Sequence, residues 1–270
     1  MLVPLYRACV KHQVQTRRGG DRFMGAVRAL APQVRSYPVS VDGLAPVYIN
    51  LAAPSWQEHE LFLTPSAHEP QLQQIFRALI QATDSVVDIG ANLGRHTVLL
   101  DSLAGYVYAF EPNAHLLPNL RRTIGGLRHT FLHACALGEE PGYVSLDIPA
   151  DHSMAKMGTG TGDCPMNRLD NLVPSAALMK VDVEGFEASV FRGGSRLLNQ
   201  PTAPVIIFEE IRRSSAARDV LASFAEAAYL FWVIPREGAI EPYTDQRPEW
   251  CDVLAVPARR LAFVRKRLGL

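Results

Sequence analysis

Short, almost wholly apolar segments alternate with amphipathic segments along most of this chain, and this alternation limits the possible folds more than any other feature. Leu72, Ile75 and Leu79 recur at the spacing of one helix face. Continuing along the chain, we predict strands and helices in turn over 85–89, 97–103, 106–110, 115–124, 130–134, 178–183, 186–198 and 204–208. Strands that are apolar on both faces and joined through helices form a parallel sheet. The sequence therefore predicts an α/β fold with a mostly parallel sheet and helices on both faces, completed by strands near 231–234 and 253–256.

The composition narrows the classes of function. The 270 residues carry 27 Lys and Arg against 27 Asp and Glu. Proteins that grip a phosphate backbone usually show a basic excess, so we expect a small-molecule substrate and no nucleic acid. The four cysteines are scattered without a C-x-x-C pair, as expected in a reducing cytoplasm. No apolar run is long enough for a membrane span, and no leader peptide is recognisable.

The chain divides into two parts by pattern. Residues 1–45 are basic and hard to assign, so we predict an N-terminal arm, followed by one folded domain over 46–270. The arm could pack on the domain or join two subunits into a homodimer. A substrate lid or a membrane-surface helix are the alternatives.

The most specific motif is V-V-D-I-G-A-N-L-G at 86–94, where a predicted strand ends in an acidic residue and a glycine turn opens a helix. In parallel sheets, ligands bind beyond the carboxyl ends of the strands, where glycine lets the backbone bend sharply. The G-x-x-x-G spacing differs from the G-x-G-x-x-G of dinucleotide binders, and a carboxylate here would repel a pyrophosphate. It would attract the ammonium and sulfonium groups of S-adenosylmethionine. We predict a cofactor site formed by Asp88, Gly90, Ala91, Asn92 and Gly94.

Two further strand ends extend this cofactor site. Glu111 and Pro112 follow the second predicted strand, about 20 residues after the glycine turn. An acidic side chain at this separation suits a ribose, whose two hydroxyls donate hydrogen bonds to it. Cys135 and Ala136 end the third strand, where small residues would let an adenine ring lie flat. Ordinary packing at this strand end is the alternative.

Charged residues cluster at the end of the fourth predicted strand, where burying them is costly unless they are paired or functional. We predict Asp182 and Glu184 as candidate catalytic bases, with Asp182 also contacting the cofactor, and His152 as a weaker candidate. Lys180 shares a strand face with Asp182 and can keep it ionised. Helix capping is one alternative. A magnesium ion on Asp182, Glu184 and Glu209 is another, but no motif demands a metal and none is assigned.

Segment 150–165 contains several glycines and threonines and few apolar anchors. We predict a mobile loop on the substrate side of the site that becomes ordered when ligands bind. A plain flexible connector would show the same composition.

Taken together and in this order, these segments resemble the FkbM family of methyltransferases. The matching pieces are D-I-G-A-N-L-G at 88–94, Y-A-F-E-P-N at 108–113, A-L-G at 136–138, R-L-D-N-L at 168–172 and K-V-D-V-E-G at 180–185. The resemblance implies a class I methyltransferase fold, with a Rossmann-like, mostly parallel, seven-stranded sheet. It also implies S-adenosylmethionine as cofactor and methyl transfer to an oxygen of a sugar or another secondary metabolite. Arg95 and His96 differ from the aromatic pair expected in the family.

Two other functions stay open at this point. A nicotinamide-dependent oxidoreductase would use the same kind of sheet, although the G-x-G-x-x-G spacing is absent. A binding module without catalysis would keep the cofactor pocket, but it would have no need of Asp182 and Glu184.

Overall fold

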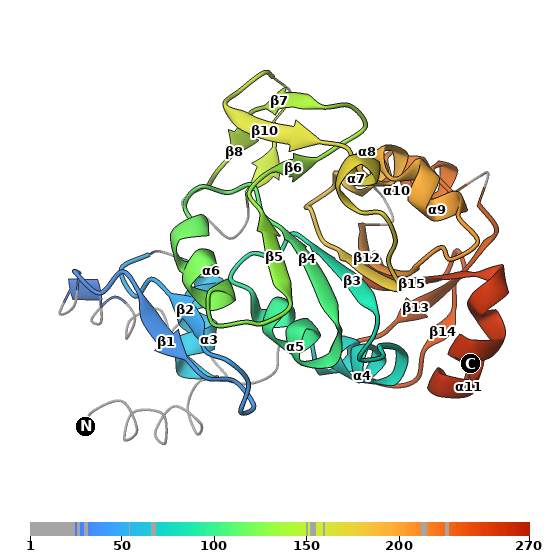
Figure 1. The fold of residues 1–270 in the computed structure, drawn as a ribbon, viewed down its shortest axis with the longest axis horizontal. Helices are drawn as coiled ribbons and strands as arrows, with labels where there is room; N and C mark the ends of the chain where they lie inside the picture. The colour runs from blue at the N-terminus through green and yellow to red at the C-terminus, as the bar shows by residue number, and fades with distance from the viewer. Residues whose placement is uncertain are drawn as a thin grey trace.

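A mixed eight-stranded sheet forms the centre of the computed structural model (Figure 1). The structure describes residues 32–53, 55–65, 69–149, 151, 155–158, 160–211, 215–224 and 227–270, with residues 25, 28 and 29. Most of the predicted N-terminal arm therefore lies outside the described residues. Among the helices that the structure describes, none combines the length and the hydropathy needed to cross a bilayer.

The strand order of the central sheet is β14-β13-β15-β12-β11-β3-β4-β5. These strands are β3 (Ser85–Ile89), β4 (Tyr106–Phe110), β5 (Thr130–His133), β11 (Leu178–Val181), β12 (Val205–Ile211), β13 (Tyr229–Ile234), β14 (Glu241–Pro242) and β15 (Trp250–Pro257). Strands β5, β4, β3, β11 and β12 are parallel, whereas β15 runs antiparallel between β12 and β13. The predicted α/β fold, with parallel strands at the centre of the sheet and helices on both faces, is confirmed. The two-residue β14 adds an eighth strand to the seven that were expected.

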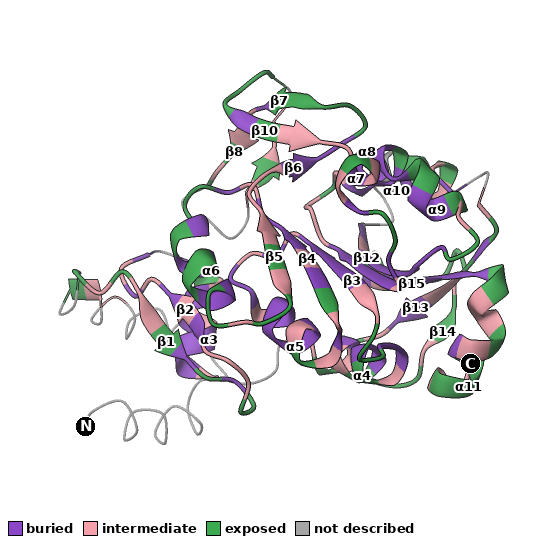
Figure 2. Ribbon diagram, viewed as in Figure 1, coloured by how far each residue is buried: buried purple, intermediate pink, exposed green. Residues whose placement is uncertain are grey.

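Helices cover both faces of this sheet, as predicted (Figure 1). One face packs against α4 (Pro70–Leu79), α5 (Arg95–Leu103), α6 (Leu117–Ile124) and α11 (Leu261–Leu268). The other packs against α7 (Leu169–Leu172), α8 (Glu187–Gly193), α9 (Ser195–Asn199) and α10 (Ser215–Ala222). Figure 2 shows that burial is concentrated in the central strands, while much of α11 is exposed. The apolar runs in the sequence thus correspond to strands covered on both faces.

Three sequence-based assignments of secondary structure were wrong in detail. The single helix predicted at 186–198 is two helices, separated at Gly194, whose φ of −107° and ψ of 17° are not helical. The segment 143–148, whose alternating residues favour an edge strand or one arm of a hairpin, is two short strands, β7 (Gly142–Val144) and β8 (Leu146–Asp147), in different sheets. The predicted loop 150–165 contains β9 (Lys156–Met157) and the start of β10 (Cys164–Asn167). Short pairings of this kind depend on a partner strand and leave no periodicity in the sequence.

The N-terminal part of the described chain packs against the glycine turn. Strands β1 (Tyr37–Val39) and β2 (Val47–Ile49) form an antiparallel hairpin, followed by α3 (Trp56–Leu63), which the sequence did not predict. Their apolar side chains share a core with Leu93, Val98 and Leu116. The division at residue 45 falls between β1 and β2, so the last residues of the predicted arm pair with the domain.

Candidate functional site

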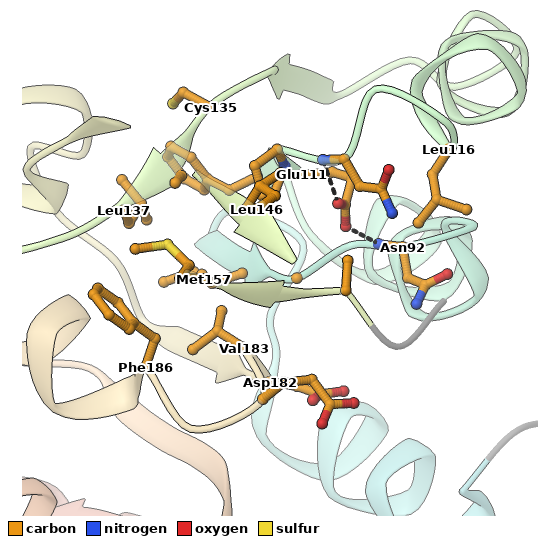
Figure 3. A pocket seen from close by; sticks show the side chains of 18 of the residues that line it. Asn92, Glu111, Leu116, Cys135, Leu137, Leu146, Met157, Asp182, Val183 and Phe186 are labelled. Atoms are coloured by element: carbon orange, nitrogen blue, oxygen red, sulfur yellow. Dashed lines mark hydrogen bonds between the residues drawn. The ribbon is translucent and has the colours of Figure 1, made fainter. Parts of the chain in front are cut away.

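A pocket opens at the carboxyl ends of β3, β4 and β11, where the sheet topology brings four of the predicted motifs together (Figure 3). It holds about 710 Å³ of empty space, including the part open to solvent. Of the residues predicted for cofactor binding and catalysis, eight border it: Gly90, Asn92, Glu111, Pro112, Cys135, Ala136, Asp182 and Glu184. His152 lies outside the described residues.

Glu111 lies on one wall of the pocket and is only 5% exposed. Its two carboxylate oxygens each accept one backbone hydrogen bond, from Asn92 N and Asn113 N, both at 2.8 Å (Figure 3). Burial raises the pKa of Glu111 to about 7, although these two donors lower it. Because each oxygen keeps a second lone pair, the carboxylate can still accept hydrogen bonds from a ligand.

The glycine turn after β3 is held against the end of β11. Gly90 has φ +77°, and a Cβ at this position would lie 1.9 Å from the carbonyl oxygen of Asp182. No side chain fits there, which explains the glycine at the first turn position. Gly94 also has a positive φ but packs against α6, and neither it nor Ala91 borders the pocket.

Asp88 does not border the pocket. Its side chain is fully buried and accepts a hydrogen bond from Thr97 Oγ1 at 2.6 Å. Lys180 Nζ lies 3.9 Å from Asp88 Oδ1 and donates to Gly90 O and to Asp182 Oδ2, both at 3.2 Å. Burial lowers the pKa of Lys180, but the charges of Asp182 and Asp88 outweigh it and leave the pKa raised. The positive group beside Asp88 in this structure is therefore Lys180, which also links the glycine turn to Asp182.

Another wall of the pocket is mostly apolar. Cys135 and Leu137 border the pocket here (Figure 3), and Phe110 is also part of the lining. Burial raises the pKa of the Cys135 thiol to about 11, so the thiol is neutral near pH 7. A flat apolar ring would fit this wall, and the thiol acts as a packing group.

Asp182 and Glu184 come together at the end of β11, as predicted. The Asp182 side chain is 42% exposed and borders the pocket at the lower edge of the view in Figure 3. Glu184 has φ +54°, and its carboxylate lies 3.6 Å from Lys156 Nζ. Burial and the charge of Asp182 raise the pKa of Glu184, partly offset by Lys156. Both carboxylates are thus in reach of a ligand in the pocket.

The hairpin of β8 and β9 also borders the pocket, and part of it belongs to the segment 150–165 that was predicted to lie on the substrate side. Its cross-strand partners Leu146 and Met157 line the pocket (Figure 3), and we call this hairpin the roof. Asp151 Oδ2 accepts a hydrogen bond from Trp56 N at 2.9 Å, which ties this hairpin to α3. Gln57 of α3 completes the rim. Neither the two-residue strands nor α3 has a periodic signal in the sequence.

The alternative of a magnesium ion held by Asp182, Glu184 and Glu209 requires these side chains to lie around one point. Within the described part of the chain, no three His, Cys, Asp or Glu side chains are placed to hold a metal ion together. Glu209 does not border the cofactor pocket but lines a separate hollow on the other side of Asp182.

Comparison with known proteins extends these observations. A sequence model of the methyltransferase FkbM domain matches residues 88–231, just over half of the chain. No curated protein matches the sequence.

Similar solved structures have low sequence identity. A methyltransferase FkbM from Methylobacillus flagellatus KT is 15% identical with a TM-score of 0.43, and the match covers 73% of this chain and 52% of that one. An rRNA methylase from Streptococcus thermophilus is 13% identical with a TM-score of 0.44, covering 69% and 93%. SMU.1697c from Streptococcus mutans, in complex with SAH, is 11% identical with a TM-score of 0.43, covering 70% and 97%.

Proposed function

Because this chain belongs to the FkbM family of S-adenosylmethionine-dependent methyltransferases, we propose that it methylates a hydroxyl oxygen of a small acceptor, such as a sugar or another secondary metabolite. One observation carries the proposal: the predicted ribose, adenine and base residues, Glu111, Cys135 and Asp182, border a single pocket. This pocket lies beyond the carboxyl ends of parallel strands, where such sheets bind their ligands.

The lining of the pocket fits the cofactor group by group. Glu111 would accept hydrogen bonds from the two ribose hydroxyls, for which it retains lone pairs. Cys135 and Ala136 would lie against the adenine ring. Asp182, the carboxylate at the open side of the pocket, would face the positively charged end of the cofactor.

When bound, S-adenosylmethionine supplies a methyl carbon that is attacked by the acceptor oxygen as its bond to sulfur breaks. The hydroxyl proton must leave as the new C–O bond forms, and Asp182 would accept it, with Glu184 as the second candidate. Lys180 would orient Asp182 through the 3.2 Å hydrogen bond. The backbone turn at Gly90 and the roof hairpin would hold the reactants close together, which is the main source of acceleration in such transfers.

Two experiments test this function. Calorimetry with S-adenosylmethionine, S-adenosylhomocysteine and NADH separates a methyltransferase from a nicotinamide-dependent oxidoreductase, because only the first should bind S-adenosylhomocysteine. A screen of radiolabelled methyl transfer against an extract of the producing cell separates an enzyme from an inactive binding module. Binding of NADH alone, or cofactor binding without transfer to any fraction, would contradict the proposal.

Further parts of the proposal concern the setting of the enzyme. We place it in the cytoplasm, without a nucleic-acid partner, on the basis of its balanced charge and scattered cysteines.

Residues 46–270 would form the methyltransferase domain, and the arm over 1–45 would join two copies into a homodimer. Light scattering of the full chain and of a chain beginning at residue 32, which keeps the pairing of β1 with β2, tests the role of the arm.

A further inference from the structure

A second hollow begins where the cofactor pocket ends. Asp182 borders both, and on its far side Glu69, Glu209 and Asp252 line a narrow space above Lys180. The same three carboxylates also line a wider groove of about 730 Å³, a volume that includes space open to solvent. We call these two connected spaces the acidic groove. Because it starts at the candidate base, an acceptor lying in it would present its reactive oxygen beside Asp182.

The carboxylates of the acidic groove lie in a row set by strand register. Glu209 of β12 and Asp252 of β15 are direct cross-strand partners. Asp182 follows Val181 of β11, whose partner on β12 is Phe208, so it continues the row on the next strand. Adjacent strands are about 4.8 Å apart. Like charges directly opposite one another destabilise a sheet, so this arrangement is costly without a compensating group.

The cations of the acidic groove do not balance this row. Lys180 is buried and already engaged with Asp182 and Asp88. Arg236, after β13, is the other cationic side chain on the lining, and it is exposed. Burial, followed by the charge of Asp182, raises the pKa of Glu209 to about 8. Burial, followed by the charge of Glu69, raises the pKa of Asp252 to about 7.

An aromatic side chain completes the acidic groove. Trp250 begins β15, is 57% exposed and lines the wider part. Its side chain interacts with Glu209 and acts against the rise in the pKa of that carboxyl. Glu69, which also lines the acidic groove, is held by His96 Nε2 at 2.8 Å. An exposed aromatic ring near carboxylates is the combination that binds organic ammonium groups, by cation–π attraction and ion pairing.

We propose that the acidic groove is the acceptor site and that the acceptor carries an ammonium group, seated between Glu209, Asp252 and the ring of Trp250. This inference rests on the proposed function, since it places the methylated hydroxyl of the same molecule beside Asp182. It adds the class of acceptor: a hydroxylated amine, such as an amino sugar or an amino alcohol. The raised pKa values favour the protonated forms of Glu209 and Asp252. A bound ammonium group would instead compensate the charge of their ionised forms.

The test compares cations with neutral molecules of the same shape. Protein saturated with S-adenosylhomocysteine is titrated with choline and its uncharged carbon isostere dimethylbutanol, and with glucosamine and glucose. Each cation should bind at least about tenfold more tightly than its neutral counterpart. The double variant Glu209→Gln, Asp252→Asn should lose this preference while its affinity for S-adenosylhomocysteine stays unchanged. Glu241→Gln, which removes an exposed carboxylate of β14, serves as the matched control.

The pH dependence gives a second measurement. Choline keeps its charge at every pH, so its affinity should rise between about pH 6 and 9 as Glu209 and Asp252 lose their protons. The other charged groups that face them are Asp182, Glu184, Lys180, Glu69 and Arg236. A flat profile, an equal affinity for cation and isostere, or no binding of either cation overturns the inference. Failure to bind S-adenosylhomocysteine in the same titrations would instead overturn the proposed function.

Discussion

At the scale of single residues, the site depends on carboxylates whose surroundings differ sharply. Glu111 is nearly buried and held by two backbone N–H groups, whereas Asp182 is partly exposed and held by Lys180. Because both oxygens of Glu111 accept backbone hydrogen bonds, its carboxylate can keep the orientation needed for two ribose hydroxyls. Only one oxygen of Asp182 accepts the hydrogen bond from Lys180, so this carboxylate is better suited to exchange a proton. Both side chains end in a carboxylate, so the difference in their expected roles comes from their surroundings.

Glu111→Ala should weaken binding of S-adenosylhomocysteine by at least about tenfold, because it removes two hydrogen bonds to a charged acceptor. In the unchanged protein, affinity should also rise between about pH 6 and 8, since the Glu111 pKa is raised to about 7 and the ionised form is the better acceptor. Calorimetry across this range measures both effects. An unaltered dissociation constant in the variant would refute the ribose assignment.

At saturating S-adenosylmethionine, Asp182→Asn should lose turnover by about 10²-fold or more, because the amide cannot accept the hydroxyl proton. The measurement is single-turnover methyl transfer to the acceptor found by the radiolabel screen. Glu184→Gln is the parallel variant. If it alone loses activity while Asp182→Asn stays near normal, the base is Glu184 and Asp182 has a structural role.

At the scale of elements, the roof over the pocket is built from short pieces with weak local preferences. Strands β8 and β9 are two residues each, and they reach α3 and the end of β11 through Asp151 and Lys156. A single hydrogen bond or exposed ion pair of this kind contributes little free energy, so only a small free energy is needed to open the roof. Such a roof suits a site that must admit and release a cofactor.

The double variant Asp151→Ala, Lys156→Met should speed the dissociation of S-adenosylhomocysteine by about tenfold, because two contacts together worth about 1–2 kcal/mol hold the roof closed. Stopped-flow measurement of the dissociation rate checks this. Asp147→Asn changes an exposed carboxylate of β8 and should behave like the unchanged protein. In the unchanged protein, S-adenosylhomocysteine should slow proteolysis within 150–165, and equal cleavage with and without it would argue against a closing roof.

At the scale of the whole molecule, the parallel sheet collects acidic side chains at one edge, because all its parallel strands end there. The carboxyl ends of β3, β4, β11 and β12 deliver Asp88, Glu111, Asp182 and Glu209 to this edge. Of these four carboxylates, Asp88 and Asp182 form ion pairs with Lys180. The protein therefore stores electrostatic repulsion in the region where ligands bind, and its stability should depend on pH.

The free energy of unfolding should fall by more than about 2 kcal/mol as the pH rises from about 5 to 8. Burial raises the folded-state pKa of Glu58, Glu111 and Asp252 to about 7 and that of Glu209 to about 8. The folded state therefore binds more protons than the unfolded state, and stability present at low pH is lost as the pH passes these values. Urea unfolding measures the slope, which Glu209→Gln with Asp252→Asn should reduce. A stability that rises over this range would contradict the assignment.

The sequence by itself determined the elements that have a local signal. Strands β3 and β4 have their predicted bounds, and the positions of Gly90 and Glu111 followed from a glycine turn and a fixed separation along the chain. Apolar runs and glycines act within a few residues, so they can be recognised without a partner. Only the tertiary structure decided which charges meet. Lys180 pairs with Asp88, Glu209 lies opposite Asp252, and Asp151 reaches Trp56 across 95 residues. Such contacts depend on strand order and register, which no local pattern of residues specifies.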